Sequence, residues 1–249
     1  MFRSGYLGDV VMTEPVARFL SKYVSKICLA TGIEGAEKIF SIYDKIYKYS
    51  RINSGEIDCD MMIKLVYELS DNKKTYIQGY MESVGFGDVN TKDIPKLKNN
   101  WSNILEYEYI LIAPFTSRWE EKKRNWGYAK FVDLSKLLEV EYNTKCILLE
   151  KHYSFTEMLS LIKHCRFFVG NDSGPAIIAQ SFKKKSFIIF GATRPEYLHM
   201  SEYTVPIYDK NRHKLCNHNS RKQELDCCEE FCMERIRVDK VFDQIKLCV

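Results

Sequence analysis

Gly170-Asn171-Asp172-Ser173-Gly174-Pro175 is the stretch that decides the fold of this chain. It follows a short apolar run, Phe167-Phe168-Val169, and leads into the small and aliphatic residues Pro175–Ala179. The pattern predicts a strand, a tight turn and a helix that begins with proline, where the missing N–H is no loss. Such a turn presents backbone N–H groups at the positive end of a helix dipole, which suits a phosphate or diphosphate. The alternative interpretation is that Asp172 and Ser173 only cap the helix.

Apolar runs and amphipathic segments alternate on both sides of this stretch. Four runs have the length and composition of buried strands: residues 109–113, 146–149, 167–169 and 187–190. Helical spacing of apolar residues marks three segments between them: 128–138, 156–164 and 174–182. This alternation predicts a parallel sheet with right-handed crossovers, so the fold class is α/β. The turns after 167–169 and 187–190 then lie at one sheet edge, the usual place for a nucleotide.

The N-terminal half predicts a second, smaller α/β domain. Its expected elements are a short strand at 1–3, a loop at 4–9, a helix capped by Thr13 with Pro15 in its first turn, strands at 26–30 and 58–67, and a helix over 76–84 that ends at Gly85. Residues 86–108 are polar and irregular and form the candidate linker. We therefore predict a reduced N-terminal domain over 1–108 and a C-terminal domain over 109–249, which ends in a cysteine-rich tail and a closing helix.

Composition places the chain among globular proteins. It has 249 residues, of which 45% are hydrophobic and 28% charged. No apolar run is long enough to span a bilayer and no secretory leader opens the chain, so we predict a cytoplasmic protein without a transmembrane segment. The nine cysteines are an odd count and do not suggest a disulfide framework. The net charge of +4 is concentrated in the second half, which suits an anionic ligand.

Four segments, taken in order, carry a family resemblance. They are Leu7-Gly8-Asp9-Val10-Val11, then Ala113-Pro114-Phe115-Thr116-Ser117 with Arg124-Asn125-Trp126, then the stretch 170–175, and finally the cysteine-rich tail. In this order they resemble the heptosyltransferase-type (family 9) glycosyltransferases, which act on lipopolysaccharide core. The resemblance implies the GT-B architecture of two Rossmann-like domains, here with a reduced N-terminal domain. The chain departs from the family at Ile177, where His is frequent.

The resemblance implies an inverting glycosyltransferase that moves a heptose-like sugar from a nucleotide-diphosphate donor to a hydroxyl group. Such a reaction needs a base for the acceptor hydroxyl, and Asp9 is the candidate for this catalytic role. The alternative is that Asp9 only flanks a helix. The leaving diphosphate needs fixed donors and cations. The predicted donor-binding residues are Gly8, Thr116, Ser117, Lys123, Arg124, Glu150, Asp172, Ser173, Gly174 and Pro175.

The predictions for Glu150, Lys123 and Arg124 each have a specific basis or a specific alternative. Glu150 ends a predicted strand at the same sheet edge, where a carboxylate can accept hydrogen bonds from ribose hydroxyls. The family's Lys-x-Trp element appears as Arg124-Asn125-Trp126, and Lys123 precedes it, so either cation could meet the diphosphate. The alternative for residues 122–124 is a solvated turn, and for Trp126 we expect core packing rather than ligand stacking.

We predict no cofactor and no metal. The Asp58-Cys59-Asp60 triplet has the spacing of a metal-binding pair, but it lies in the other half of the chain and we interpret it as incidental. A zinc site is the alternative for Cys216, Cys227, Cys228 and Cys232, although their spacing lacks paired C-x-x-C knuckles.

The resemblance also bears on the partners. It favours an ADP-linked donor over a UDP-linked one. The expected acceptor is lipopolysaccharide or another glycan, and a glycolipid acceptor would bring the protein to a membrane surface. Two alternatives stay open: a phage-type transferase that glycosylates modified DNA, and a non-catalytic module that binds nucleotide sugars.

Overall fold

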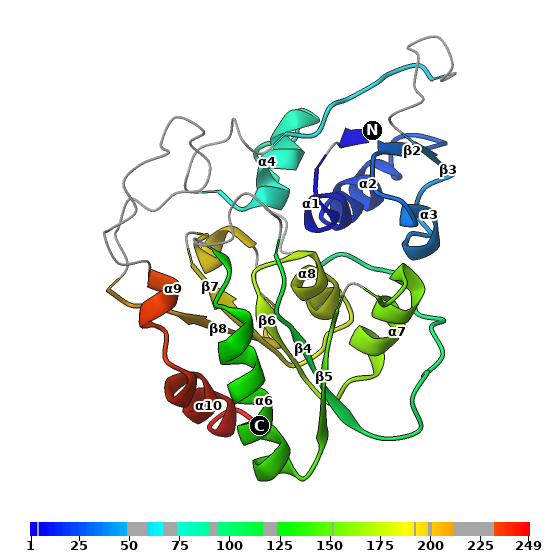
Figure 1. Cartoon of the computed structure of the whole chain (residues 1–249). Coiled ribbons are helices and arrows are strands. Elements are labelled where there is room, and N and C mark those ends of the chain that lie inside the picture. The colour runs from blue at the N-terminus through cyan, green and yellow to red at the C-terminus, as the bar shows by residue number, and fades with distance from the viewer. Residues whose placement is uncertain are drawn as a thin grey trace. The chain divides into compact units, whose positions relative to one another are not determined.

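The computed structural model describes residues 1–3, 5–48, 59–66, 74–89, 94–116, 124–150, 152–191, 193–198, 201–211 and 232–249. The chain forms two compact units, one of Met1–Asn100 with Glu196–His199 and one of Trp101–Pro195 with Met200–Val249. Each unit contains a parallel sheet with helices (Figure 1). The predicted fold class, α/β with parallel sheets, is therefore confirmed.

The C-terminal unit is built on a five-stranded parallel sheet in the order β5-β4-β6-β7-β8. Its strands are β4 (Tyr109–Ala113), β5 (Lys145–Leu148), β6 (Phe168–Asn171), β7 (Ser186–Phe190) and β8 (Thr204–Tyr208). The first four confirm the strands expected from the sequence. The fifth was not expected, because Pro206 weakens a strand pattern. Proline is tolerated on an edge strand, which is where β8 lies.

Helices cover both faces of this sheet. They are α6 (Tyr128–Tyr142), α7 (Phe155–His164), α8 (Gly174–Ser181), the short α9 (Cys232–Arg235) and α10 (Val238–Lys246). Figure 1 shows α6 and α10 on one face and α7 and α8 on the other. The alternation along β4 agrees, because Ile110 and Ile112 pack in the cluster with α6 while the Tyr109 hydroxyl donates to the Leu161 carbonyl of α7 at 3.0 Å. None of the described helices is long and apolar enough to cross a membrane.

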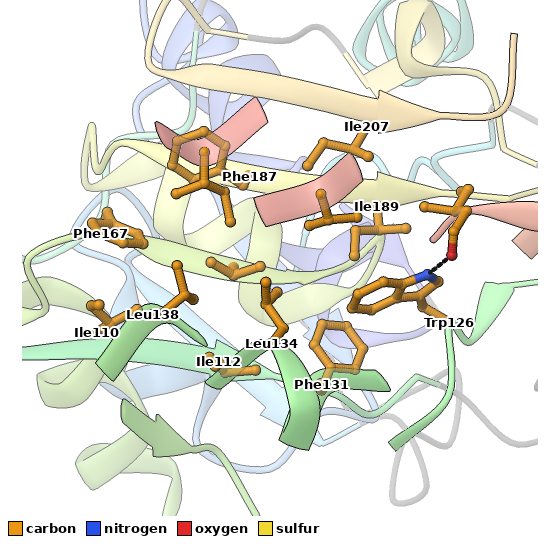
Figure 2. Packing of buried hydrophobic residues seen from close by; sticks show 14 of the residues in the cluster. Ile110, Ile112, Trp126, Phe131, Leu134, Leu138, Phe167, Phe187, Ile189 and Ile207 are labelled. Carbon is orange, nitrogen blue, oxygen red and sulfur yellow. Dashed lines mark hydrogen bonds between the residues drawn. The ribbon is translucent and has the colours of Figure 1, made fainter. Parts of the chain in front are cut away.

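The main core of this unit lies between the sheet and the pair α6 and α10 (Figure 2). Trp126 is almost fully buried in it and meets Phe131 edge to face, with ring centroids 4.9 Å apart. The indole Nε1 donates to the Ile236 carbonyl at 2.7 Å, which satisfies its one polar group. The expectation that Trp126 is a core residue is confirmed. This contact also anchors the segment between α9 and α10 to the core.

The N-terminal unit is smaller. A three-stranded parallel sheet in the order β1-β2-β3 contains β1 (Phe2–Arg3), β2 (Cys28–Thr31) and β3 (Lys45–Lys48). Its helices are α1 (Leu7–Val11), α2 (Glu14–Leu20), α3 (Ala36–Ile39) and α4 (Tyr76–Ser83), and a 3₁₀ helix, η3, spans Pro195–Leu198. The expected β1, β2, α2 and α4 are confirmed. Gly85 has φ +83° just beyond α4, a conformation that glycine adopts without strain.

Two local predictions in this unit are wrong. No strand runs through the described residues 59–66, where Lys64 makes only an isolated bridge to Phe2. The physical reason is that β1 has only two residues and offers no long edge to pair with. The third strand is instead β3, whose four residues are too few to show a strand period. Residues 4–9 are not all loop, because Leu7–Val11 form α1 and place Asp9 inside a helix.

Candidate functional site

A topological switch point lies in the sheet of the C-terminal unit. The chain passes from β4 to β5 on one side and then returns to form β6 on the other side of β4. In such sheets the connections beyond the carboxyl ends of the two central strands diverge and leave a crevice for a ligand. Here those connections are the segment Pro114–Thr116 after β4 and the segment Asp172–Ser173 after β6.

Asn171 joins the segments around this switch point. Its side chain is fully buried at the end of β6. The Nδ2 group donates to the Pro114 carbonyl at 2.7 Å, and Oδ1 accepts from the Trp126 backbone N–H at 3.0 Å. Gly170 precedes it, and a Cβ there would lie 2.9 Å from the Ala113 carbonyl oxygen. A glycine and a buried asparagine therefore hold the ends of β4 and β6 in close register.

Three backbone amides at the start of α8 have no acceptor among the described residues. Ser173 is the N-cap residue, and its carbonyl accepts the first helical bond from the Ile177 N–H at 3.2 Å. Within the part of the chain that the structure describes, the N–H groups of Ser173, Gly174 and Ala176 donate to no acceptor. The Ser173 hydroxyl donates to the Asn171 carbonyl and does not cap the helix. The arrangement therefore offers three donors to an external anion.

Asp172 uses both its backbone N–H and its carboxylate in hydrogen bonds within the protein. Its backbone N–H donates to the Ile189 carbonyl at 3.1 Å, so it does not join the three free amides. Its buried carboxylate accepts from Arg124 Nη2 at 2.6 Å, and the same nitrogen donates to the Asp172 carbonyl at 2.9 Å. Two bonds from one nitrogen fix the guanidinium close to the start of α8. Arg124 is thus brought to the predicted anion site, and Asp172 serves it as a partner.

Glu150 lies at the same edge of the sheet, beyond β5. The ladder continues past the strand, because the Leu149 N–H donates to the Ile112 carbonyl at 2.7 Å. The Glu150 carboxylate accepts from the Tyr128 hydroxyl at 3.2 Å, and His152 Nδ1 lies 3.5 Å from its other oxygen. Neighbouring strands are ~4.8 Å apart, so β5 and β6 are separated by about 10 Å across β4. Glu150 and the start of α8 therefore flank the switch point.

Asp9 lies in the N-terminal unit. Its Oδ2 accepts from the Tyr6 backbone N–H at 2.9 Å, and Oδ1 lies 3.6 Å from Arg3 Nη2. Its side chain is 13% exposed. These contacts are those of a carboxylate in the first turn of a helix, as the alternative interpretation expected. Gly8 precedes it in α1, and its carbonyl accepts from the Met12 N–H at 3.0 Å. The role of Asp9 as a base stays a prediction.

Several predicted residues lie outside the part of the chain that the structure describes. They are Ser117, Lys122 and Lys123, together with Cys216, Cys227 and Cys228 of the tail. Thr116 is the last described residue after β4, and Pro175 lies in the first turn of α8. Among the described ranges, no three His, Cys, Asp or Glu side chains gather in a way that could hold a metal ion.

Three residues of this edge were not singled out from the sequence. From the sequence, Asn171 is interpreted as part of a turn, and Phe115 and Tyr128 are interpreted as ordinary aromatic residues. The sequence holds one signal for these two residues, which is their place beside expected elements. Phe115 lies just after the strand expected over 109–113, and Tyr128 begins the helix expected over 128–138. No sequence signal links Tyr128 to Glu150, because the two are 22 positions apart.

Comparisons with known proteins bear on the fold and the family. The model of glycosyltransferase family 9 (heptosyltransferase) matches residues 138–233. This range contains Glu150 and the start of α8, but not Asp9, Thr116 or Arg124. Among curated proteins, no sequence matches the chain significantly.

Solved structures match nearly the whole chain. TibC from enterotoxigenic E. coli H10407, an iron-containing dodecameric glycosyltransferase, matches with a TM-score of 0.74 and 14% identity over 99% of this chain and 75% of that one. A family 9 glycosyltransferase from Veillonella parvula DSM 2008 matches with a TM-score of 0.69 and 12% identity over 99% and 95%. E. coli heptosyltransferase WaaC, solved with ADP-2-deoxy-2-fluoro heptose, matches with a TM-score of 0.58 and 10% identity over 100% and 98%.

At such low identities the likeness to solved structures shows the fold, and the family model adds a likeness to family 9 over residues 138–233. The chain has the GT-B fold of these heptosyltransferases, and its match over residues 138–233 confirms the resemblance to glycosyltransferase family 9 and the predicted enzyme class, a glycosyltransferase.

Proposed function

We propose that this protein transfers a heptose-like sugar from an ADP-linked donor to a hydroxyl group, with inversion and without a metal ion. One observation carries the proposal: three unpaired amides at the start of α8 lie beside the fixed guanidinium of Arg124, at the switch point of the sheet. Such a site is suited to a diphosphate, the leaving group of a nucleotide sugar.

The donors at α8 can stabilise the charge that develops on the diphosphate. Amides of Ser173, Gly174 and Ala176 are held by the helix and need no reorganisation when the glycosidic bond breaks. Arg124 adds a cation, and Asp172 balances part of its charge. In the proposal, Thr116, Ser117 and Lys123 add hydroxyl groups and a second cation. Backbone donors and side-chain cations together replace a bridging metal.

The rest of the nucleotide would extend along the sheet edge toward β5. Glu150 follows β5, which lies two strand spacings, ~10 Å, from β6, and a ribose joined to a diphosphate spans a distance of this order. A carboxylate at this position can accept bonds from the ribose hydroxyls. An adenine nucleotide is supported by WaaC, which was solved with an ADP-linked heptose analogue. The donor of this chain is proposed to be ADP-linked on that basis.

Asp9 is the proposed base. One of its oxygens accepts from the Tyr6 N–H and the other lies near Arg3. In the proposed reaction this carboxylate takes the proton of the acceptor hydroxyl while the new C–O bond forms on the face of the sugar opposite the leaving diphosphate. Inversion of configuration follows from this single in-line displacement.

The proposed acceptor is lipopolysaccharide or another glycan, and the proposed compartment is the cytoplasm. The support is the resemblance to enzymes of lipopolysaccharide core synthesis. Modified DNA is the competing acceptor and would be distinguished by transfer of labelled sugar.

The test combines binding with turnover. We expect ADP-heptose and ADP to raise the midpoint of thermal unfolding, because a ligand that binds only the native state stabilises it. UDP-glucose should raise it less. Labelled ADP-heptose should then donate sugar to a core oligosaccharide, with release of ADP. Binding of ADP-heptose without transfer to either a core oligosaccharide or DNA would favour the non-catalytic module instead.

A further inference from the structure

Tyr128 and Phe115 form an aromatic pair at the carboxyl edge of the sheet. Phe115 follows β4 and Tyr128 is the first residue of α6. Their rings are nearly parallel, at 20°, with centroids 5.7 Å apart. Both remain accessible, with exposed fractions of 39% for Phe115 and 43% for Tyr128. Offset stacking of this kind is favourable and restricts the orientation of the Tyr128 ring.

The stacked ring aims its hydroxyl at Glu150. The Tyr128 hydroxyl donates to Glu150 Oε1 at 3.2 Å. Desolvation raises the pKa of the Tyr128 phenol, and the hydrogen bond to Glu150 raises it further. The phenol therefore keeps its proton at neutral pH and acts as a donor to the carboxylate. Glu150 lies at an exposed edge, where His152 Nδ1 is 3.5 Å from its other oxygen, and fixing such a side chain costs conformational entropy.

We propose that Tyr128 is a positioning residue that holds the Glu150 carboxylate ready for the two hydroxyls of a ribose; this rests on the proposed function, in which Glu150 meets the donor's ribose. A carboxylate has about four lone-pair sites. Tyr128 takes one of them and His152 Nδ1 lies 3.5 Å from the other oxygen, and the sites that remain are enough for both hydroxyls of a cis-diol. Because Tyr128 fixes the carboxylate before the nucleotide arrives, less entropy is lost on binding.

This role makes Tyr128 a determinant of specificity for ribonucleotide donors. When the nucleotide lacks a ribose hydroxyl, the fixed carboxylate loses one of its bonds. A site built to bond a substrate hydroxyl discriminates against the analogue that lacks it. A Glu150 side chain that rotates freely can turn toward water and would discriminate less.

The experiment compares ADP and 2′-deoxy-ADP by isothermal titration calorimetry. The key variant is Tyr128→Phe, which keeps the ring and its stacking but removes the hydroxyl. Tyr153→Phe is the matched control, because Tyr153 is close in sequence and its N–H donates to the Glu150 backbone carbonyl at 3.4 Å. The wild type should prefer ADP by about tenfold, as expected for one hydrogen bond to a charged group. Tyr128→Phe should lose most of this preference, and Tyr153→Phe should keep it.

A double variant tests whether the two residues act together. In a Glu150→Gln background, adding Tyr128→Phe should change the preference little, because the carboxylate it positions is gone. An undiminished preference in Tyr128→Phe would overturn the inference. Equal binding of ADP and 2′-deoxy-ADP by the wild type would overturn it too but leave the proposed function standing. Failure of the wild type to bind either nucleotide would overturn the proposed function itself, and the inference with it.

Discussion

The Asp172 carboxylate accepts from the Arg124 guanidinium at 2.6 Å, and the two residues lie 48 positions apart in the sequence. This bond connects the end of β6 to the segment before α6 and holds a cation beside the amides at the start of α8. Asp172 thus positions Arg124, and the backbone amides that follow Asp172 are available to the ligand.

The first prediction concerns Arg124. Replacing it with glutamine should weaken ADP binding at least about tenfold while changing adenosine binding little, because the guanidinium acts on the diphosphate. Calorimetric titration with both ligands measures the difference. Arg166→Gln is the matched control: Arg166 pairs with Glu108 and lies two residues before β6 begins, at the opposite end of the strands. An equal loss of affinity for ADP and adenosine would mean that Arg124 acts only through the fold.

The second prediction concerns the amides of α8. Gly174→Val should abolish donor binding, because the added side chain crowds the approach of a phosphate to the Ser173 and Ala176 N–H groups. Gly32→Val serves as the control, since a Cβ at Gly32 meets nothing within 4 Å. Both variants would be titrated with ADP after their unfolding midpoints are compared. Normal ADP affinity in folded Gly174→Val would exclude α8 as the phosphate site.

The third prediction concerns Asp9. Asp9→Asn should lower kcat by about a hundredfold or more with nearly unchanged donor affinity, as expected when a general base is lost. Asn keeps an oxygen that can accept from the Tyr6 N–H, so the first turn of α1 should persist. Asp133→Asn, an exposed site on α6, is the control. Steady-state kinetics with the true acceptor gives the answer, and wild-type turnover in Asp9→Asn would remove Asp9 from the mechanism.

The fourth prediction concerns metal ions. We expect sugar transfer to persist in EDTA, because amides and cations serve the diphosphate in the proposed mechanism. The measurement is turnover with and without chelator, together with the metal content of the purified protein. TibC is an iron-containing protein of the same fold, so iron is included in that analysis. Activity that is lost in EDTA and restored by magnesium or manganese would contradict the mechanism and return Asp58-Cys59-Asp60 to consideration.

Much of the C-terminal unit could be predicted from the sequence, because its signals are local. Apolar runs of strand length, helical spacing and the turn from Gly170 to Pro175 mark β4 to β7 and α6 to α8. The start of α8 could be predicted for the same reason, since proline and small residues there have a direct backbone consequence.

The remainder depends on contacts between residues that are distant in the sequence. β2 pairs with β1 on one side and with β3 on the other, whereas residues 59–66 meet β1 only at the isolated bridge of Lys64 to Phe2, and no local pattern decides which segment pairs where. The bonds of Asn171 to Pro114 and of Tyr128 to Glu150 likewise cross tens of residues. Residue types alone therefore locate the turn that begins the site, but not the side chains that complete it.

A crystal structure of the protein with ADP is the most direct test of the proposed donor site. We predict that diphosphate oxygens lie within about 3 Å of the N–H groups of Ser173, Gly174 and Ala176. We also predict that the Arg124 guanidinium contacts the diphosphate and that the ribose hydroxyls meet Glu150. A nucleotide bound elsewhere, with no ligand oxygen at the amides of α8, would contradict this proposal.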